Sequence, residues 1–555
     1  MASPIKVSSY RKRIESLKSE RSDFVPLWRE LSDHHLAHRG RFLVTDRNKG
    51  KKRNTKQLNN TSRLANRTMA AGMMAGITSP ARPWFRLSMP DRKLMEYSPV
   101  KTWLMQVEGL MREVYNKSNL YNSLHTIYSE LGTFGIASLG VFSDFNTVIR
   151  FKPHTVGSYM IATDGLDKVD TWAREYQMTV GQLVKQFGKE AVSLSVRQRW
   201  ESGDTEGWVS VCHVIEPNDD RDSQSPLAID KKFRSIYFEE DSKGADAQVL
   251  HQSGFDSFPI LTPRWDIAGE DIYGTSCPGM DALGDVKGLQ EAVRKYAMAV
   301  DSQIDPAVQV PTSLRNHGRI LPGDRVPHDG PTKIEAIHSV NPNLQAMQGY
   351  ITNIEQRISR TWYEDLFLML ANSNRSQITA REVAERHEEE LLMLGPVLER
   401  LHNELLDPLI NRTFDIMQEA GILPPAPPEL QGIDLRVEYI SVLAQAQRMV
   451  ATSGVEQLAG FVGQLSQIWP EVRHKFDPAQ AIDDYAAALG TAPDIVKADD
   501  EYEEALESEA QQAAEASKAE QTMQGIQAAQ QLARTPIDEN SGLAEVARMT
   551  EGGSV

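Results

Sequence analysis

Cysteine is nearly absent from the sequence, which has only Cys212 and Cys277 among its 555 residues. Two cysteines cannot form a disulfide framework or supply a cysteine-based zinc or iron–sulfur site, and their scarcity is typical of a reducing compartment. We expect both to be small, buried, apolar side chains.

Long apolar runs are also missing. The best candidate, Met69–Ile77, has about half of the roughly 18 to 20 apolar residues that a bilayer crossing needs. The basic N-terminus is not followed by an apolar segment, so no secretory signal is predicted. We therefore expect no membrane partner, and synthesis and residence in the cytoplasm.

The motifs of common enzymes do not occur. The nearest approach to a phosphate-binding loop, Gly188–Glu190, lacks the hydroxyl group that would hold magnesium. A dinucleotide-binding glycine motif, a nucleophile elbow, a zinc helix and an EF-hand loop are equally missing. Catalysis driven by any of these motifs is thereby excluded.

Two histidine clusters raise the question of metal binding. His34 and His38 lie four residues apart on a predicted helix with His35 between them, and His387 precedes Glu388–Glu390 on another predicted helix. A metal site needs several ligands of fixed geometry, whereas a charged run on an amphipathic helix is typical of a solvated face. The sequence predicts no enzyme, no metal and no cofactor.

Charge is distributed unevenly along the chain. Lys and Arg number 60 and Asp and Glu 76, so the net charge is −16, which argues against a coat that binds nucleic acid by neutralising phosphates. Residues 1–67 nevertheless contain 17 basic and 6 acidic residues, and residues 494–555 contain 4 basic and 14 acidic residues. Each segment is either a solvated surface or a surface that meets its own partner, and both interpretations stay open.

The first half of the chain contains predicted helices and then predicted strands. Apolar spacing indicates helices over 6–38, over Thr61–Ile77 and over 98–132, the last broken near residues 116–122. Short apolar runs separated by turn residues predict a strand-rich module over 136–265, with one helix near Thr179–Phe187. The predicted fold class is α+β, mainly helical.

Two amphipathic stripes predict a protruding pair of long helices. The spacing of three and four residues indicates that each stripe packs against the other. The stripe residues are Val286, Leu289, Val293, Tyr296, Val300 and Ile304 in the first helix, and Met347, Ile351, Ile354, Ile358 and Trp362 in the second. The proline-rich segment 306–342 between them must be a compact insertion at the tip.

Helices dominate the remaining sequence. After a polar loop near 371–377, Thr379 and Glu382 fit a capping box that begins a long helix. Pro396 should kink or break this helix, and a proline-rich link near 422–430 marks a boundary. Beyond it the sequence predicts only helices, ending in an acidic stretch rich in alanine and glutamine.

Three segments together resemble the portal, or head-to-tail connector, proteins of short-tailed bacteriophages. They are the helix Thr61–Ile77 with the following TSPARPWFRLSMP, the segment PILTPRWDIAGEDIYGTSCPGMDALGDVKGLQ that enters the first long helix, and the ITAREVAER start of the later helix. The resemblance covers about residues 5–440.

The resemblance implies a multi-domain subunit that assembles into a ring of twelve at one capsid vertex. The implied parts are a wing (1–280), stem helices (281–305 and 343–370), a clip (306–342), a tunnel loop (371–378), a long kinked wing helix (379–430), a crown (431–498) and an acidic tail (499–555). Double-stranded DNA would pass through the ring during packaging and ejection. The implied partners are the terminase large subunit, tail adaptor and tail proteins, and the major capsid and scaffolding proteins.

The residues expected to serve this function lie in the tunnel loop and the clip. The DNA-channel candidates are Asn372, Asn374, Arg375, Ser376 and Gln377. The candidates for docking terminase or tail are Arg315, Arg319, Arg325 and Lys333. The alternative is another virion structural protein, such as an internal-core or tail-ring component. In either case the protein would be assembled in the host cytoplasm and reside in the virion.

Overall fold

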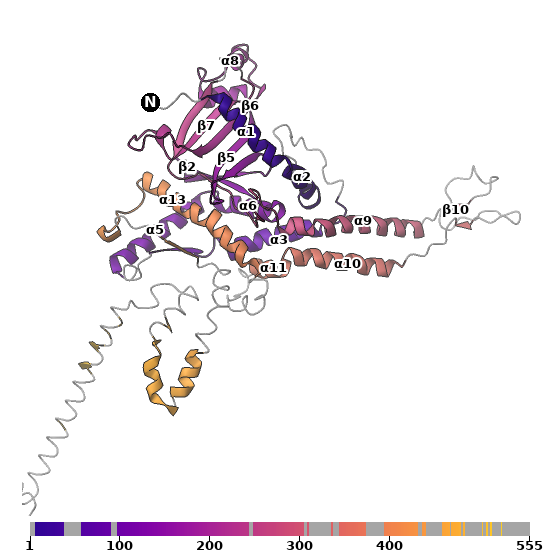
Figure 1. Ribbon diagram of the computed structural model, residues 1–555. Helices are drawn as coiled ribbons and strands as arrows, with labels where there is room; N and C mark the ends of the chain where they lie inside the picture. Colours follow the sequence, from indigo (N-terminus) through magenta and orange to yellow (C-terminus); the bar gives the residue numbers. More distant parts are fainter. Residues whose placement is uncertain are drawn as a thin grey trace, which may run out of the picture.

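The computed structural model describes most of the chain up to residue 439 and short pieces beyond it. The described residues are 6–37, 57–89, 97–242, 248–304, 308–309, 335–336, 343–372, 393–430, 436–439, 458–466, 468–478, 481–482 and a few positions between 502 and 523. A sheet-containing module lies on a helical body, and a pair of long helices projects from that body (Figure 1).

The module is built on an antiparallel sheet of five strands in the order β4-β5-β6-β7-β8. These strands are β4 Tyr159–Thr163, β5 Val169–Thr179, β6 Trp208–Pro217, β7 Phe233–Glu239 and β8 Val249–Phe255. Helix α1 (Val7–Ser22) packs against one face, where Ile14 and Leu17 meet Ala173, Val214 and Phe238. A smaller sheet has the order β3-β2-β9, with β2 Ser138–Asp144, β3 Val148–His154 and β9 Ile260–Leu261. The predicted strand-rich module is confirmed.

Two short helices cap one end of the five-stranded sheet. Helix α7 (Val180–Phe187) is the predicted one, and it begins with a capping box between Thr179 and Gln182. Helix α8 (Leu194–Glu201) was not predicted; its start is capped by the Ser193 side chain, and its one fully buried residue is Val196. Eight residues with a single buried position give too little periodicity to be recognised in a sequence.

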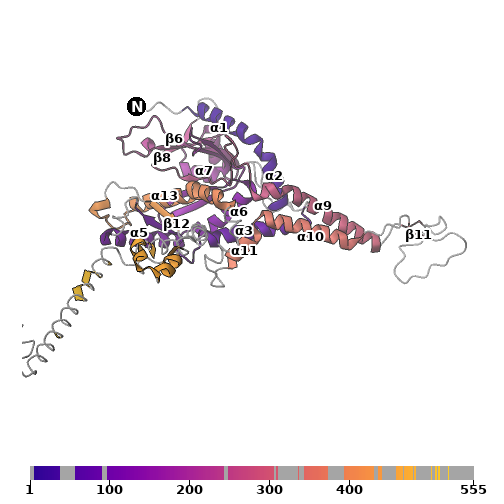
Figure 2. The same ribbon diagram turned by 60° about the horizontal axis from the view of Figure 1, so that its bottom comes forward.

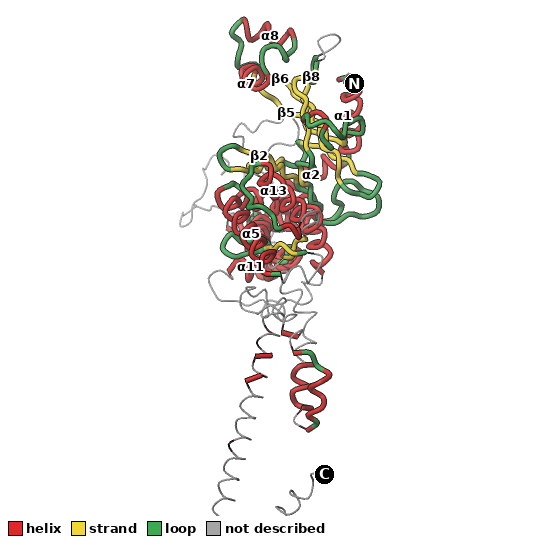
Figure 3. The backbone as a smooth tube through the Cα atoms, turned by 90° about the vertical axis from the view of Figure 1, so that its left-hand side faces the viewer, coloured by secondary structure: helices red, strands yellow, loops and turns green. Residues whose placement is uncertain are grey.

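The helical body contains the largest hydrophobic core. Its main helices are α3 (Thr61–Gly76), α5 (Ser98–Lys117), α6 (Leu120–Phe134), α11 (Glu364–Asn372) and α13 (Asp407–Glu419). Figure 3 shows this body beneath the strands of the module. Small residues of α3 allow α11 to approach closely, because a Cβ atom at Gly72 would lie 2.5 Å from the Cβ and backbone oxygen of Phe367. The predictions of a small-residue helix and a helix pair over 98–132 are confirmed.

The prediction of one helix over 6–38 is wrong, because two helices meet at Asp23. Helix α1 ends at Ser22, and α2 covers Phe24–His35. Pro26 lies in the first turn of α2, where its ring would crowd the carbonyl group of Ser22 in a continuous helix. In the first turn of a new helix, by contrast, proline is well tolerated, because its missing N–H has no intrahelical partner there.

The projecting pair consists of α9 (Pro278–Ile304) and α10 (Leu344–Thr361). Helix α9 starts seven residues earlier than Asp285, where its predicted stripe begins. The second long helix does not continue to residue 370, since Tyr363 has a φ of 51° and α11 starts at Glu364. The left-handed conformation of Tyr363 changes the direction of the chain between α10 and α11. As a result, α11 packs on α3 and does not continue the axis of α10.

The later helix, predicted to kink or break near Pro396, does not break there, and a kink is not tested because residue 392 lies outside the described residues. Residues 393–401 are helical, and the irregularity is a π-turn at His402–Leu406, where the N–H of Asp407 donates to the carbonyl of His402. Pro408 explains the wider turn, because its ring would crowd the carbonyl of Glu404 in a regular α-helix. The capping box at Thr379 and Glu382 lies outside the described residues.

The prediction that only helices follow residue 430 is wrong at β12 (Arg436–Tyr439). This strand pairs antiparallel with β1 (Phe85–Ser88), with Leu87 opposite Val437. Four residues are too few to show a strand period in the sequence. Because β12 lies on β1, the chain returns to the helical body after residue 430, inside the segment expected to be crown. A helix was predicted over residues 441–469, and residues 458–466 are helical. Residues 441–457 lie outside the described part of the chain.

Replacing Gly72 with alanine should separate α3 from α11. The added Cβ has no space beside Phe367, so we expect the free energy of unfolding to fall by about 1–3 kcal/mol. The matched control is Gly109→Ala in α5, where no heavy atom lies within 4 Å of the added Cβ. Urea denaturation should show the control to be about 0.5–1 kcal/mol more stable, because alanine restricts the unfolded chain. If Gly72→Ala and Gly109→Ala changed the free energy of unfolding equally, the close packing of α3 on α11 at Gly72 would be contradicted.

Candidate functional site

The projecting helices α9 and α10 lie side by side in both views of the molecule (Figures 1 and 2). Near the body their facing side chains are fully buried: Val286 and Leu289 of α9 meet Ile354 and Ile358 of α10 in the main core. Toward the tip, Val293, Tyr296, Val300 and Met347 are only partly buried. The hairpin is therefore anchored firmly at its base and thinly packed at its end.

Three large apolar side chains of the hairpin are exposed: Met298 is 59%, Ile304 77% and Tyr350 59% exposed. The prediction that Ile304 packs against the second helix is therefore wrong, because it lies in the last turn of α9, beyond the part of the hairpin where the two stripes are buried. The described residues leave the three side chains uncovered, because the hairpin projects away from the body and α9 and α10 already face each other (Figure 2). Exposed apolar residues gathered on one projecting element are typical of an interaction surface.

A buried glutamine fixes the base of the hairpin to the segment before α3. The Oε1 atom of Gln290 accepts from the backbone N–H groups of Leu58, at 2.6 Å, and Asn59, at 2.9 Å. Its Nε2 atom donates to the carbonyl of Asn59 at 3.1 Å. The Asn59 side chain in turn donates to Glu355 of α10 at 2.7 Å. The side-chain amides of Gln290 and Asn59 together thus link α9, α10 and the segment before α3.

Two exposed ion pairs add to this base. Arg357 of α10 and Asp285 of α9 are 2.6 Å apart, and Lys287 of α9 lies 2.6 Å from Glu30 of α2. Surface pairs of this kind contribute at most about 1 kcal/mol each to the free energy of unfolding. They therefore help to orient the helices but add little to the stability of the base.

The end of α10 is held by Trp362, whose side chain is completely buried. The ring of His35 lies 5.6 Å from it, and the Nδ1 atom of His35 forms a hydrogen bond with the Ser62 hydroxyl. Burial lowers the pKa of His35 to about 3, so the imidazole is neutral and packs as an uncharged ring. His34 bonds instead to the carbonyl of Glu30, and His38 lies outside the described residues. His34 and His35 are therefore engaged in packing contacts.

At the tip of the hairpin, two short strands close the insertion. β10 (Val308–Gln309) pairs antiparallel with β11 (Glu335–Ala336), which brings both ends of the insertion together. The docking candidates lie between these strands, outside the described residues: Arg315, Arg319, Arg325 and Lys333. Their role stays a prediction.

The DNA-channel candidates lie just after α11. Ala371 and Asn372 are still helical, so the loop expected over 371–378 is wrong at its first two positions. The other four candidates lie outside the described residues: Asn374, Arg375, Ser376 and Gln377. His387 and Glu388–Glu390 are outside them too.

Among the described residues, one cluster has donor atoms close enough for a metal ion, at Glu175, Cys212 and Glu240. The ammonium group of Lys18 in α1 already contacts both carboxylates, at 3.1 Å for Glu240 and closer for Glu175. Burial also raises the pKa of the Cys212 thiol, which disfavours the thiolate a metal needs. A lysine therefore supplies the positive charge at this place. Cys277 is buried like Cys212, as predicted.

No described helix is both long enough and apolar enough to cross a bilayer.

The chain has extensive similarity to known proteins. The family model described as bacteriophage head to tail connecting protein matches residues 7–496. The portal protein of Salmonella phage epsilon15 is 44% identical over 540 residues, and the probable portal protein of Bordetella phage BPP-1 is 44% identical over 544 residues. In both comparisons the similarity covers 97% of this chain and 97% of the relative.

Replacing Gln290 with leucine should loosen the base of the hairpin. Two backbone N–H groups would lose their acceptor, so we expect the free energy of unfolding to fall by about 1–3 kcal/mol. The control is Asp285→Asn, which disrupts an exposed ion pair at the same base and should cost less than about 1 kcal/mol. Urea denaturation measures both, and an equal or larger loss in the control would contradict the role of Gln290.

Proposed function

The chain belongs to the family of bacteriophage head to tail connecting proteins, and from this premise we propose that it is the portal subunit of a phage virion. In this proposal, twelve copies form a ring at one capsid vertex. Double-stranded DNA enters the head through the ring and later leaves through it. The similarity over nearly the whole length of two relatives named as portal proteins supports the proposal.

The observation that carries the ring is the exposed apolar surface of the hairpin. Helix α9 has 27 residues and is therefore about 40 Å long, and its second half, after Gln290, lies beyond the helical body. Met298, Ile304 and Tyr350 remain exposed on this rod. A second copy of the hairpin, repeated around an axis, would bury them, because closed rings join one surface of a subunit to a different surface of the next.

In the proposed ring, each part of the chain has a position. The five-stranded module and the helical body form the wing, α9 and α10 the stem, and residues 306–342 the clip. The loop after Asn372 narrows the channel, and the residues after 439 form the crown and the acidic tail. Clip cations such as Arg315 and Lys333 would contact DNA, a neighbouring subunit or the docked terminase and then the tail.

Electrostatics suits a passive conduit. Each subunit contributes a net charge of −16, so the assembled ring repels DNA overall. Strong phosphate neutralisation along the bore would hold the duplex in place, since each neutralised phosphate adds salt-dependent affinity. A few cationic or amide groups, with Arg375 as the first candidate, suffice to centre the duplex. ATP hydrolysis would belong to the terminase large subunit.

Purified protein should form closed rings. Negative-stain images are expected to show annular particles with twelvefold symmetry and a central hole. Met298→Asp should weaken ring formation, because it places a charge on the surface that the next subunit covers. The matched control is Phe145→Asp, which changes an exposed apolar residue on the β2–β3 turn and should leave the rings intact. Filaments, hexamers or stable monomers of the unaltered protein would contradict the proposal.

Replacing Arg375 with glutamate tests the tunnel loop. We expect rings of normal appearance and a loss of packaged DNA, because a carboxylate repels the phosphates that the guanidinium group would centre. The measurement is the length of the packaged genome in particles assembled with the variant. An unchanged genome length would remove Arg375 from the channel.

A further inference from the structure

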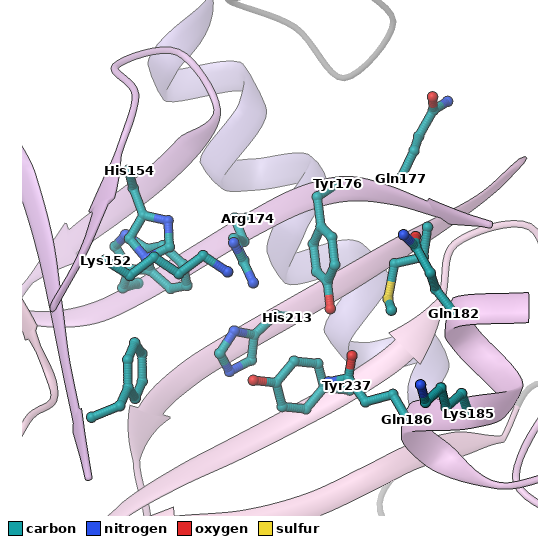
Figure 4. Close-up of a pocket in the computed structure, with 13 residues that line it drawn as sticks. Lys152, His154, Arg174, Tyr176, Gln177, Gln182, Lys185, Gln186, His213 and Tyr237 are labelled. Carbon is teal, nitrogen blue, oxygen red and sulfur yellow. The ribbon is translucent and has the colours of Figure 1, made fainter. Parts of the chain in front are cut away.

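A pocket of about 810 Å³ lies in the module, on the face of the five-stranded sheet opposite α1. Its floor is a row of side chains that are direct cross-strand neighbours: Arg174 of β5, His213 of β6 and Tyr237 of β7. Figure 4 shows His213 at the centre of the pocket, between Arg174 and Tyr237. The volume is in the range of small-molecule binding sites.

The pocket is positively charged in a chain that has an excess of acidic residues. Lys152, Arg174 and Lys185 line it, and no aspartate or glutamate does. Within the described part of the chain, none of these three cations forms an ion pair. Unpaired cations around a pocket that has no carboxylate in its described lining are typical of an anion site.

Buried polar atoms in the pocket wall lack partners. His213 is 1% exposed, and its Nε2 atom bonds to the Ser235 hydroxyl at 3.0 Å. Its Nδ1 atom has no partner among the described residues, and neither do Nε2 of His154, Nε1 of Trp172 and Nε of Arg174. Burial, together with the charges of Arg174 and Lys152, lowers the pKa of His213, so its ring is neutral.

Aromatic rings form the remaining walls. The rings of His213 and Tyr237 are stacked with centroids 3.8 Å apart and planes 10° apart. The guanidinium group of Arg174 lies 4.1 Å from the ring centroid of Tyr176 and 5.7 Å from that of Trp172. A planar ring in a ligand would meet aromatic and guanidinium faces, an arrangement that binds nucleobases by stacking.

We propose that this pocket binds a small anion that carries a planar aromatic ring, a class represented by nucleoside 5′-phosphates. The ring stacks within the aromatic walls, the phosphate meets Arg174 and Lys152, and Lys185 at the other end of the pocket adds to the positive potential (Figure 4). Gln186 of α7 also lines the pocket and offers amide donors and an acceptor to the edge of a base. Inorganic phosphate alone would leave the aromatic walls unused. The inference does not depend on ring assembly.

Calorimetric titration of the full-length protein tests the ligand class. The probes are the four deoxynucleoside 5′-monophosphates, the matching deoxynucleosides without phosphate, and inorganic phosphate. We expect at least one monophosphate to bind about tenfold more tightly than its nucleoside and than phosphate, because only the monophosphate uses both the cations and the rings. Failure of all four monophosphates to bind at millimolar concentration would overturn the proposal, as would equal binding of nucleoside and nucleotide.

Two sources could supply the same chemistry, a free nucleotide or the 5′-phosphorylated end of a DNA strand. A short oligonucleotide with a 5′-phosphate and the same oligonucleotide with a 5′-hydroxyl distinguish them. Binding that requires the 5′-phosphate assigns the strand end, whereas binding of monophosphates alone assigns the free nucleotide.

Substitutions locate the binding in this pocket. Arg174→Gln should weaken nucleotide binding by about tenfold or more. The double substitution Lys152→Gln, Lys185→Gln should do the same, and because both lysines are exposed it leaves the fold intact even where Arg174→Gln does not. The matched control is Arg197→Gln in α8, which removes an arginine outside the pocket and should not change binding. Equal weakening by the control would place the ligand elsewhere.

Discussion

The packing of α9 against α10 at the helical body is the interaction on which the rest of this molecule depends. Val286, Leu289, Ile354 and Ile358 bury that contact completely, and Trp362 closes it at the body. Beyond it, the described residues of the hairpin are half-buried or exposed. The hairpin is therefore a rod fixed at one end.

The hairpin and the strand-rich module could be predicted because their signals are local. Apolar stripes at helical spacing, such as Ile351 to Ile358, and short runs between turn residues are readable in one segment. The turn at Tyr363 could not be predicted, because it depends on the packing of α11 against α3. The α3 residue that allows this packing, Gly72, lies nearly three hundred residues before Tyr363 in the sequence. Strand β12 was missed for the same reason, since its partner β1 is equally remote.

The family resemblance located the function better than any single residue did. The sequence directed attention to loops that lie outside the described residues, so Arg375 and the clip cations stay predictions. The pocket on the sheet was not recognised because Arg174, His213 and Tyr237 come from three strands and each is unremarkable alone. Alternation along a strand predicts which side chains share a face, but strand order decides which of them become neighbours.

The pairing of β1 with β12 has a consequence for how the chain is made. Strand β1 lies near residue 85, and its partner appears only at residues 436–439. A growing polypeptide on the ribosome therefore holds an unpaired β1 while residues 89–435 are added, even though domains fold during translation as their segments emerge. The sheet of β1 and β12 can form only after residues 436–439 have been synthesised.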